Sequence, residues 1–281
     1  MEGGTASYYM GQNEAGDGKS EDWNFAYGAG SQKGSLMFGL NHTKQGGVMA
    51  KDRAITSSSY GPDISGAFSW GTGPWGRIRP VNATGGAGTG FDLVLNHTGG
   101  ELGDGVGQSS RDPANYHTRS GSNLNDLFNS TSQMDFQSPT RLTTIFAKGF
   151  LELTPSVSLT STAMASERNS TRTIAGYPLA SNSQANYPVY VDKDAYYNPK
   201  GNQVAGAGLG QDLFFTRRTI DRPRTTENAS KTFHFDAGLT GDVSLLGSSW
   251  TWGVGLNYND VSGTTLSNGN PQLGTAYNCG T

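Results

Sequence analysis

The stretch "KTFHFDAGLTGDVSLLGSSWTWGVGLNYND", Lys231 to Asp260, separates into two kinds of side chain when every second residue is read. One set is apolar and aromatic: Phe233, Phe235, Ala237, Leu239, Trp250, Trp252, Val254, Leu256 and Tyr258. The residues between them are small or polar. Because successive side chains of a β-strand point to opposite faces of the sheet, the stretch predicts two strands that share one apolar and one polar face. The pattern breaks at Thr240–Ser249, where we expect the turn.

The same alternation recurs elsewhere, and helical periodicity is almost absent. The further alternating segments are Thr5–Gly11, Asp22–Gly30, Ser35–Asn41, Thr144–Leu153 and Val157–Ala165. Each has an apolar and a polar face, with Met37 as an exception on the polar side of its segment. Together with the opening pair, they predict an all-β protein with about seven clear strands.

The connections between these segments come in two sizes. Ser31–Gly34 and Leu153–Ser156 are tight turns, whereas residues 46–136 and 172–211 form long polar connections. Compact soluble domains rarely contain structureless loops beyond about 15 residues. Transmembrane β-barrels alternate short periplasmic turns with long extracellular loops. The rhythm favours an antiparallel transmembrane β-barrel whose apolar face contacts lipid and whose polar face lines a wet lumen. A soluble β-sandwich or a secreted β-solenoid is the alternative.

Composition fits this interpretation. Of 281 residues, 34% are hydrophobic, 15% are charged and 41 are glycine. A barrel wall needs an apolar residue only at every second strand position, so a low apolar content is expected. The net charge of −3 and the lack of a basic stripe argue against nucleic acid as a partner. The single cysteine, Cys279, excludes an internal disulfide framework and a cysteine-based zinc site.

Four segments, taken in order, carry a resemblance to a known family. They are Ala6–Arg53, Gln137–Thr171, the motif "YYNPKGN" at Tyr196–Asn202, and Leu213–Asp260. The last contains an arginine-rich stretch ending in "PR", a strand with "GLTGD", a turn and a strand with "WTW". Together they resemble the barrel region of TonB-dependent outer-membrane receptors of the large proteobacterial type.

This resemblance implies a 22-stranded barrel closed by an N-terminal plug, in the outer membrane of a Gram-negative bacterium. The implied activity is active, TonB-energised uptake of a scarce nutrient such as a siderophore or saccharide. Implied partners are outer-membrane lipid, a TonB-type energy-coupling protein and the small-molecule ligand. No plug and no TonB-binding segment is recognisable near Met1. We therefore expect residues 1–281 to be an internal part of such a barrel, without the plug and the C-terminal strands.

Candidate ligand-binding residues occur in two places. The stretch "GAFSWGTGPWGRIRP" (Gly66–Pro80) places Trp70, Trp75, Arg77 and Arg79 in the first long connection, and Arg217 and Arg218 belong to the main charge cluster. Exposed aromatic rings stack on sugars, and arginine binds anionic groups. The simpler alternatives are that the tryptophans pack the loop and that the arginines extend a solvated strand.

No motif supports catalysis, a metal or a cofactor. The four histidines are scattered, and "GDGKS" at Gly16–Ser20 lacks the first glycine and the following helix of a phosphate loop. No nucleophile elbow of the form Gly-x-Ser-x-Gly is present. We therefore expect a protein that is not an enzyme. A passive porin, a surface adhesin or a secreted polysaccharide-active enzyme are the competing functions.

Overall fold

The computed structural model describes residues 2–58, 72–100, 102–119, 126–183 and 188–271. The chain folds as two compact units. The first, here called the strand unit, comprises Met1–Val48, Gln137–Arg172 and Thr226–Leu266. The second, called the loop unit, comprises Met49–Phe136, Thr173–Thr225 and Ser267–Thr281. No helix among the described residues is long and apolar enough to cross a membrane.

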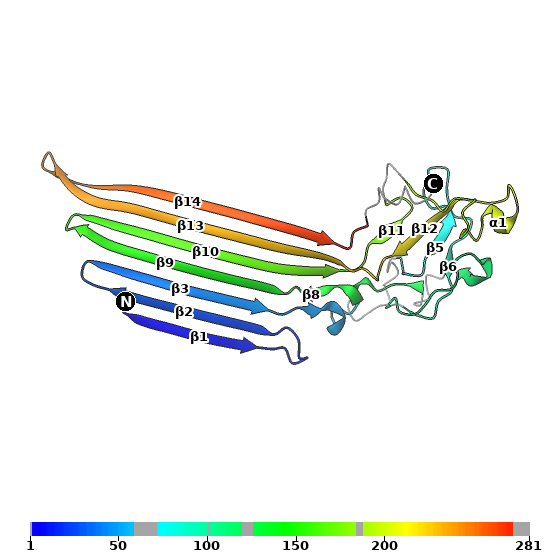
Figure 1. The fold of residues 1–281 in the computed structure, drawn as a ribbon, viewed down its shortest axis with the longest axis horizontal. Coiled ribbons are helices and arrows are strands. Elements are labelled where there is room, and N and C mark those ends of the chain that lie inside the picture. Colours follow the sequence, from blue (N-terminus) through cyan, green and yellow to red (C-terminus); the bar gives the residue numbers. More distant parts are fainter. Residues whose placement is uncertain (1, 59–71, 101, 120–125, 184–187, 272–281) are drawn as a thin grey trace. The chain divides into compact units, whose positions relative to one another are not determined.

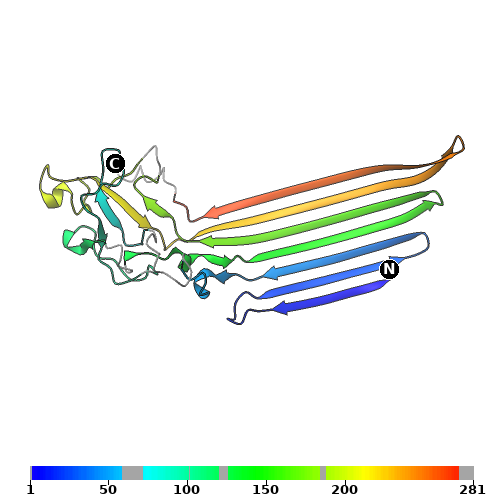
Figure 2. The same ribbon diagram turned by 180° about the vertical axis from the view of Figure 1, so that it is seen from behind.

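The strand unit is a single seven-stranded sheet, shown from its two sides in Figures 1 and 2. Its order is β1-β2-β3-β9-β10-β13-β14, and the first five strands pair antiparallel. The strands are β1 (Gly3–Gly11), β2 (Ser20–Gly30), β3 (Gly34–Gln45), β9 (Thr140–Thr154), β10 (Val157–Ile174), β13 (Arg224–Leu245) and β14 (Ser248–Asn268). The prediction of an all-β chain with about seven long strands is confirmed. The sheet is open, with β1 and β14 at its edges.

Three tight turns, β2–β3, β9–β10 and β13–β14, lie at the same end of the sheet (Figure 1). The last differs from the prediction, because β13 continues to Leu245 and β14 begins at Ser248. Leu246 and Gly247 have φ angles of 52° and 78°. Positive φ at both central residues is the feature of a type I′ hairpin turn, which matches the twist of the flanking strands. The ten-residue turn expected at Thr240–Ser249 was therefore too long.

The register places the apolar side chains on one face. Tyr27 lies opposite Phe38, Phe38 opposite Ala147, and Ala147 opposite Ala163. This face is exposed: Leu256, for example, is 64% exposed. Among the described residues, no buried apolar side chain of the protein belongs to any of the seven strands. The sheet therefore has no core of its own.

The opposite face carries cross-strand hydrogen bonds between polar side chains. Asn41 Nδ2 donates to Asn24 Oδ1 at 2.6 Å, and Thr251 Oγ1 donates to Asp242 Oδ1 at 2.8 Å. The face is not uniformly polar, because Phe146 also lies on it, across Gly39, whose place a larger residue could not take. The expected division into an apolar and a polar face holds for most positions; besides Phe146 and Met37, Phe150 and Met164 also lie on the polar side.

The loop unit contains a five-stranded sheet of order β11-β12-β5-β6-β7. Its strands are β5 (Arg77–Pro80), β6 (Leu93–Leu95), β7 (Tyr116–Thr118), β11 (Pro178–Ala180) and β12 (Leu213–Arg218). A separate pair joins β4 (Val48–Met49) and β8 (Asp135–Gln137). Short helical elements are η1 (Ala50–Asp52), η2 (Pro113–Asn115), η4 (Ser130–Gln133) and α1 (Asn202–Ala205).

The loop unit has a packed apolar interior. Phe128 and Leu213 are fully buried, and Leu127, Val94 and Phe214 are at most 4% exposed. The segments 46–136 and 172–211 were expected to be long loops. They instead contain short strands, and β12 joins them because Phe215 pairs with Ile78 of β5. The apolar residues scattered through these segments are the reason, since together they bury a core that neither segment has alone.

Candidate functional site

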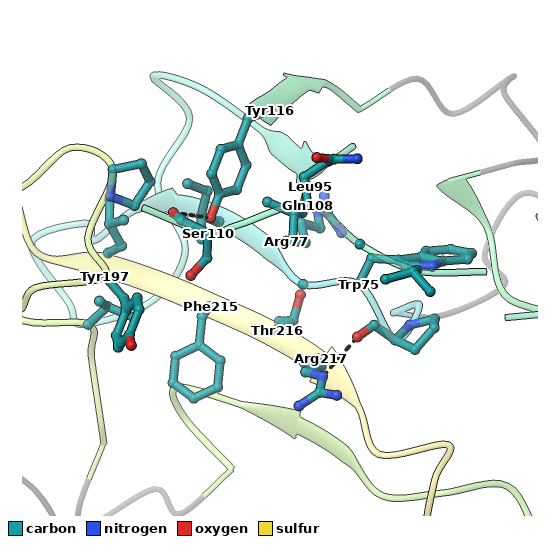
Figure 3. A pocket seen from close by; sticks show the side chains of 18 of the residues that line it. Trp75, Arg77, Leu95, Gln108, Ser110, Tyr116, Tyr197, Phe215, Thr216 and Arg217 are labelled. Carbon is teal, nitrogen blue, oxygen red and sulfur yellow. Dashed lines mark hydrogen bonds between the residues drawn. The ribbon is translucent and has the colours of Figure 1, made fainter. Parts of the chain in front are cut away.

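A cavity of about 630 Å³ opens in the loop unit. Side chains from β5, β6 and β12 line it, together with the stretches around residues 103–116 and 191–199. Three of the predicted binding residues belong to the lining: Trp75, Arg77 and Arg217. Figure 3 shows Trp75 and Tyr197 at opposite ends of this cavity. Its size suits a small-molecule ligand.

Trp75 is fixed by ring stacking and is largely inaccessible to a ligand. Its ring lies on the imidazole of His97 with centroids 3.5 Å apart and planes inclined by 5°. Only 8% of the residue is exposed, so one indole face is not available to a sugar ring. The indole Nε1 is buried and has no hydrogen-bond partner among the described residues. Trp75 thus forms a fixed wall of the cavity.

Behind this wall, two histidines converge on a buried carboxylate. His117 Nε2 lies 2.8 Å from Asp126 Oδ1, and His97 Nε2 lies 3.5 Å from the same atom. Nδ1 of His97 donates to the carbonyl of Gly99 at 2.9 Å, which orients the ring under Trp75. No group of three or more His, Cys, Asp or Glu side chains in the described part of the chain is arranged to hold a metal ion. We interpret the cluster as the support of the tryptophan.

Arg77 and Arg217 differ in how their charges are compensated. Arg77 makes a bidentate contact with Asp92, with nitrogen–oxygen distances of 2.6 and 2.5 Å. Arg217 is exposed, and its Nε donates to the carbonyl of Pro74 at 2.8 Å. No described acid forms an ion pair with Arg217, although Asp221 also lines the cavity. Arg217 is therefore the cation that an anionic ligand group could pair with.

Arg79 and Arg218 do not line the cavity. Arg79 lies over the ring of Phe214 at 5.4 Å, and burial, followed by repulsion from Arg77, lowers its pKa. Arg218 lies over the ring of Phe128 at 5.4 Å. Its Nη1 donates to a backbone carbonyl at 2.9 Å, and burial lowers its pKa. Both arginines serve packing within the loop unit. The remaining predicted residue, Trp70, lies outside the described residues.

The cavity also contains residues that sequence reasoning missed. Tyr197 is 65% exposed and Phe215 stands near it, so both present aromatic rings to the cavity (Figure 3). The Tyr116 hydroxyl donates to the carbonyl of Ser110 at 2.9 Å, and burial raises the pKa of Tyr116 to about 12. The Thr216 hydroxyl is buried and has no hydrogen-bond partner among the described residues.

The motif "YYNPKGN" is the sequence feature from which Tyr197 could have been identified as a cavity residue. The first of its two asparagines, Asn198, is fully buried. The Asn198 amide donates to the carbonyls of Asp192 and Gln211 at 2.9 and 2.8 Å, and its oxygen accepts from the Lys200 backbone at 2.8 Å. A buried side chain that satisfies several backbone groups fixes a loop in one conformation. This network sets the position of the neighbouring Tyr197.

Comparison of the chain with family models, with curated proteins and with solved structures finds no significant match. The resemblance to TonB-dependent receptors stays a hypothesis. The two features of the molecule that bear on function are the exposed apolar face of the sheet and the cavity of the loop unit.

Proposed function

We propose that this chain is part of an outer-membrane receptor that takes up a small molecule, with the seven-stranded sheet as barrel wall and the loop unit as ligand-binding region. The observation that carries the proposal is the exposed apolar face. Val254 and Trp250 are 65% and 60% exposed. Soluble monomers rarely expose apolar patches larger than a few hundred Å². Lipid is the solvent that makes such a face favourable.

The length of the apolar run supports the same proposal. Trp250 to Tyr258 covers eight residue steps. At about 3.3 Å per step this is roughly 26 Å along the strand, or about 20 Å across a membrane at the usual tilt of about 40°. Outer-membrane barrels have an apolar band of about 25 Å flanked by aromatic residues. The run has aromatic residues at both ends, with Val254 and Leu256 between them.

The open edges of the sheet require further pairing in a membrane. β1 pairs only with β2, and β14 only with β13. Unpaired backbone groups cost several kcal/mol each in hydrocarbon, so open sheet edges do not occur there. In this proposal, further strands complete the wall, as the predicted larger barrel requires.

The cavity is the proposed ligand site. Its lining combines the exposed ring of Tyr197, the ring of Phe215 and the uncompensated cation of Arg217. Such a lining suits a ring-bearing molecule with an anionic group, such as a siderophore or an acidic saccharide. The proposed mechanism is binding followed by transport driven through a TonB-type protein, without chemical change of the ligand.

Tryptophan quenching by brominated lipid tests the membrane assignment. Two variants would each keep a single tryptophan, either Trp252 on the apolar face or Trp75 in the loop unit, with phenylalanine at the other tryptophan positions. We expect brominated acyl chains to quench Trp252 strongly and Trp75 weakly. If Trp252 is not quenched in the reconstituted protein, the membrane assignment is wrong.

Ligand binding tests the cavity. The probes are a ferric tricatecholate complex, which is anionic and aromatic, and a neutral oligosaccharide. Arg217→Gln should weaken binding of the anionic probe about tenfold, since a charge-assisted hydrogen bond contributes about 1.5–3 kcal/mol. Arg222→Gln removes an exposed arginine that does not line the cavity and serves as control. If the two variants bind the anionic probe with equal affinity, Arg217 does not contribute to the ligand site.

A further inference from the structure

One row across the apolar face of the strand unit is charged. The register places Glu21 opposite Lys44, Lys44 opposite Arg141, and Arg141 opposite Asn169. This row lies at the end of the sheet away from the three tight turns (Figure 1). It therefore marks the end of the apolar band on the side of the long connections.

The adjacent row has the composition of a membrane interface. Tyr8 lies opposite Trp23, with ring centroids 4.2 Å apart, and Trp23 lies opposite His42. His42 Nδ1 and Thr143 Oγ1 are 2.8 Å apart, so the polar groups in this row pair with each other. Tyrosine and tryptophan concentrate at headgroup depth, where one part of the ring is dry and the other wet. The charged row thus lies two residues further along each strand than this aromatic row, on the side away from the tight turns.

Lys44 and Arg141 are cations placed side by side without compensation. Both are exposed, and neither forms an ion pair with a described acid, although Glu21 is the register partner of Lys44. Like charges directly opposite each other in a sheet are destabilising. A bound anion that contacts both side chains would remove this repulsion.

A groove of about 510 Å³ lies at these two residues. Besides Lys44 and Arg141 it is lined by Asn169, Thr171 and Thr264, which offer amide and hydroxyl donors. One acid, Glu227, also belongs to the lining. The alternation along β9 and β10 puts Arg141, Asn169 and Thr171 on the same face as Ile145 and Ala165, which is the face proposed to contact lipid.

We propose that this groove binds the phosphorylated headgroup of a lipid in the leaflet on the long-connection side. The assignment rests on the proposed insertion of the sheet into a membrane. Charge complementarity and continuity with the apolar face single out a lipid: its phosphate pairs with Lys44 and Arg141 while its acyl chains lie along the rows of Trp23 and Phe25. Each lysine or arginine near an anionic membrane surface contributes about 1 kcal/mol of attraction.

The test compares two double variants of the protein purified in detergent. Lys44→Gln with Arg141→Gln removes both groove cations. Lys148→Gln with Arg168→Gln removes one cation from β9 and one from β10 on the opposite face, and is the matched control. Native mass spectrometry measures how much phosphatidic acid each protein retains, with phosphatidylcholine of the same chain length as neutral reference.

We expect the groove variant to retain about thirtyfold less phosphatidic acid than the wild type or the control variant, with equal retention of phosphatidylcholine. This fold-change corresponds to the loss of two cation contacts of about 1 kcal/mol each. Equal retention of phosphatidic acid by the two double variants would overturn the proposal. The single variant Lys44→Gln gives a second reading if the double variant fails to fold.

Quenching of Trp252 by brominated lipid, measured on the reconstituted single-tryptophan variant described above, separates this proposal from the one on which it rests. If Trp252 is quenched and phosphatidic acid retention does not change, only the headgroup site is wrong. If Trp252 is not quenched, the membrane insertion fails and the headgroup site fails with it.

Discussion

The strand unit and the loop unit treat apolar side chains in opposite ways. In the loop unit, Phe128 and Leu213 are fully buried. In the strand unit, Trp250 and Leu256 are 60% and 64% exposed, and no described residue of its seven long strands contributes to a buried apolar core. One unit follows the rules of a protein in water, whereas the other has its apolar groups outside. The hydrophobic content of the whole chain, 34%, does not distinguish these two arrangements.

The largest effect should come from the interior of the loop unit. Phe128→Ala removes a fully buried ring that also lies under the guanidinium of Arg218. Phe→Ala substitutions in a core cost about 3–5 kcal/mol. We expect the loop unit of this variant to unfold at a lower urea concentration than that of the wild type. Hydrogen exchange of the backbone amides in the loop unit measures this unfolding. Phe136→Ala, at a side chain that is 54% exposed, should change stability by less than about 0.5 kcal/mol. Equal effects would mean that the loop unit has no packed core.

A smaller effect should separate the two faces of the sheet. Leu256→Arg places a charge on the proposed lipid face and should cost about 2–4 kcal/mol of folding free energy in lipid vesicles. Gly255→Arg, one residue earlier, points to the other face. There a Cβ atom would meet its nearest neighbour, the Ala237 carbonyl oxygen, at 3.6 Å, which is an ordinary contact. Similar losses at the two positions would argue that both faces meet the same environment.

The smallest effect concerns pH and the loop unit alone. Burial raises the pKa of Tyr116 to about 12, above its ordinary value of 10.0. The neutral hydroxyl is favoured in the folded state, so its contribution is fully present below pH 10 and is lost as the pH rises towards 12. Tyr116→Phe should lower stability at neutral pH by about 1 kcal/mol, through the lost hydrogen bond. It should also flatten the fall in stability between pH 10 and 12, measured by chemical denaturation. An unchanged slope would show that another group causes the fall.

Sequence reasoning was sufficient for the strand unit because its signal is local. Alternation over seven or more residues identifies a strand and its faces. The turn at Leu246–Gly247 was missed because Val243 and Leu245 continue the alternation into a region read as loop. A two-residue turn requires positive φ angles at both residues. In the sequence, only Gly247 indicates such a backbone conformation.

The loop unit could not be predicted in the same way. Strands such as β6, with three residues, are too short to show a period. The roles of the arginines depend on partners far away in sequence. Arg77 is compensated by Asp92, 15 residues later, whereas Arg79 packs against Phe214 on another strand. The cavity residue Phe215 lies in an unremarkable "LFFT" stretch, so only its pairing with β5 brings it to the site.

The pairing of β12 with β5 also bears on how the loop unit folds. Leu213 meets Pro80 across more than a hundred intervening residues. Those residues include β9 and β10, which belong to the sheet. Contacts between such distant segments are slow to form. The cavity of the loop unit therefore cannot form until residue 217 has been synthesised and β5 and β12 have met.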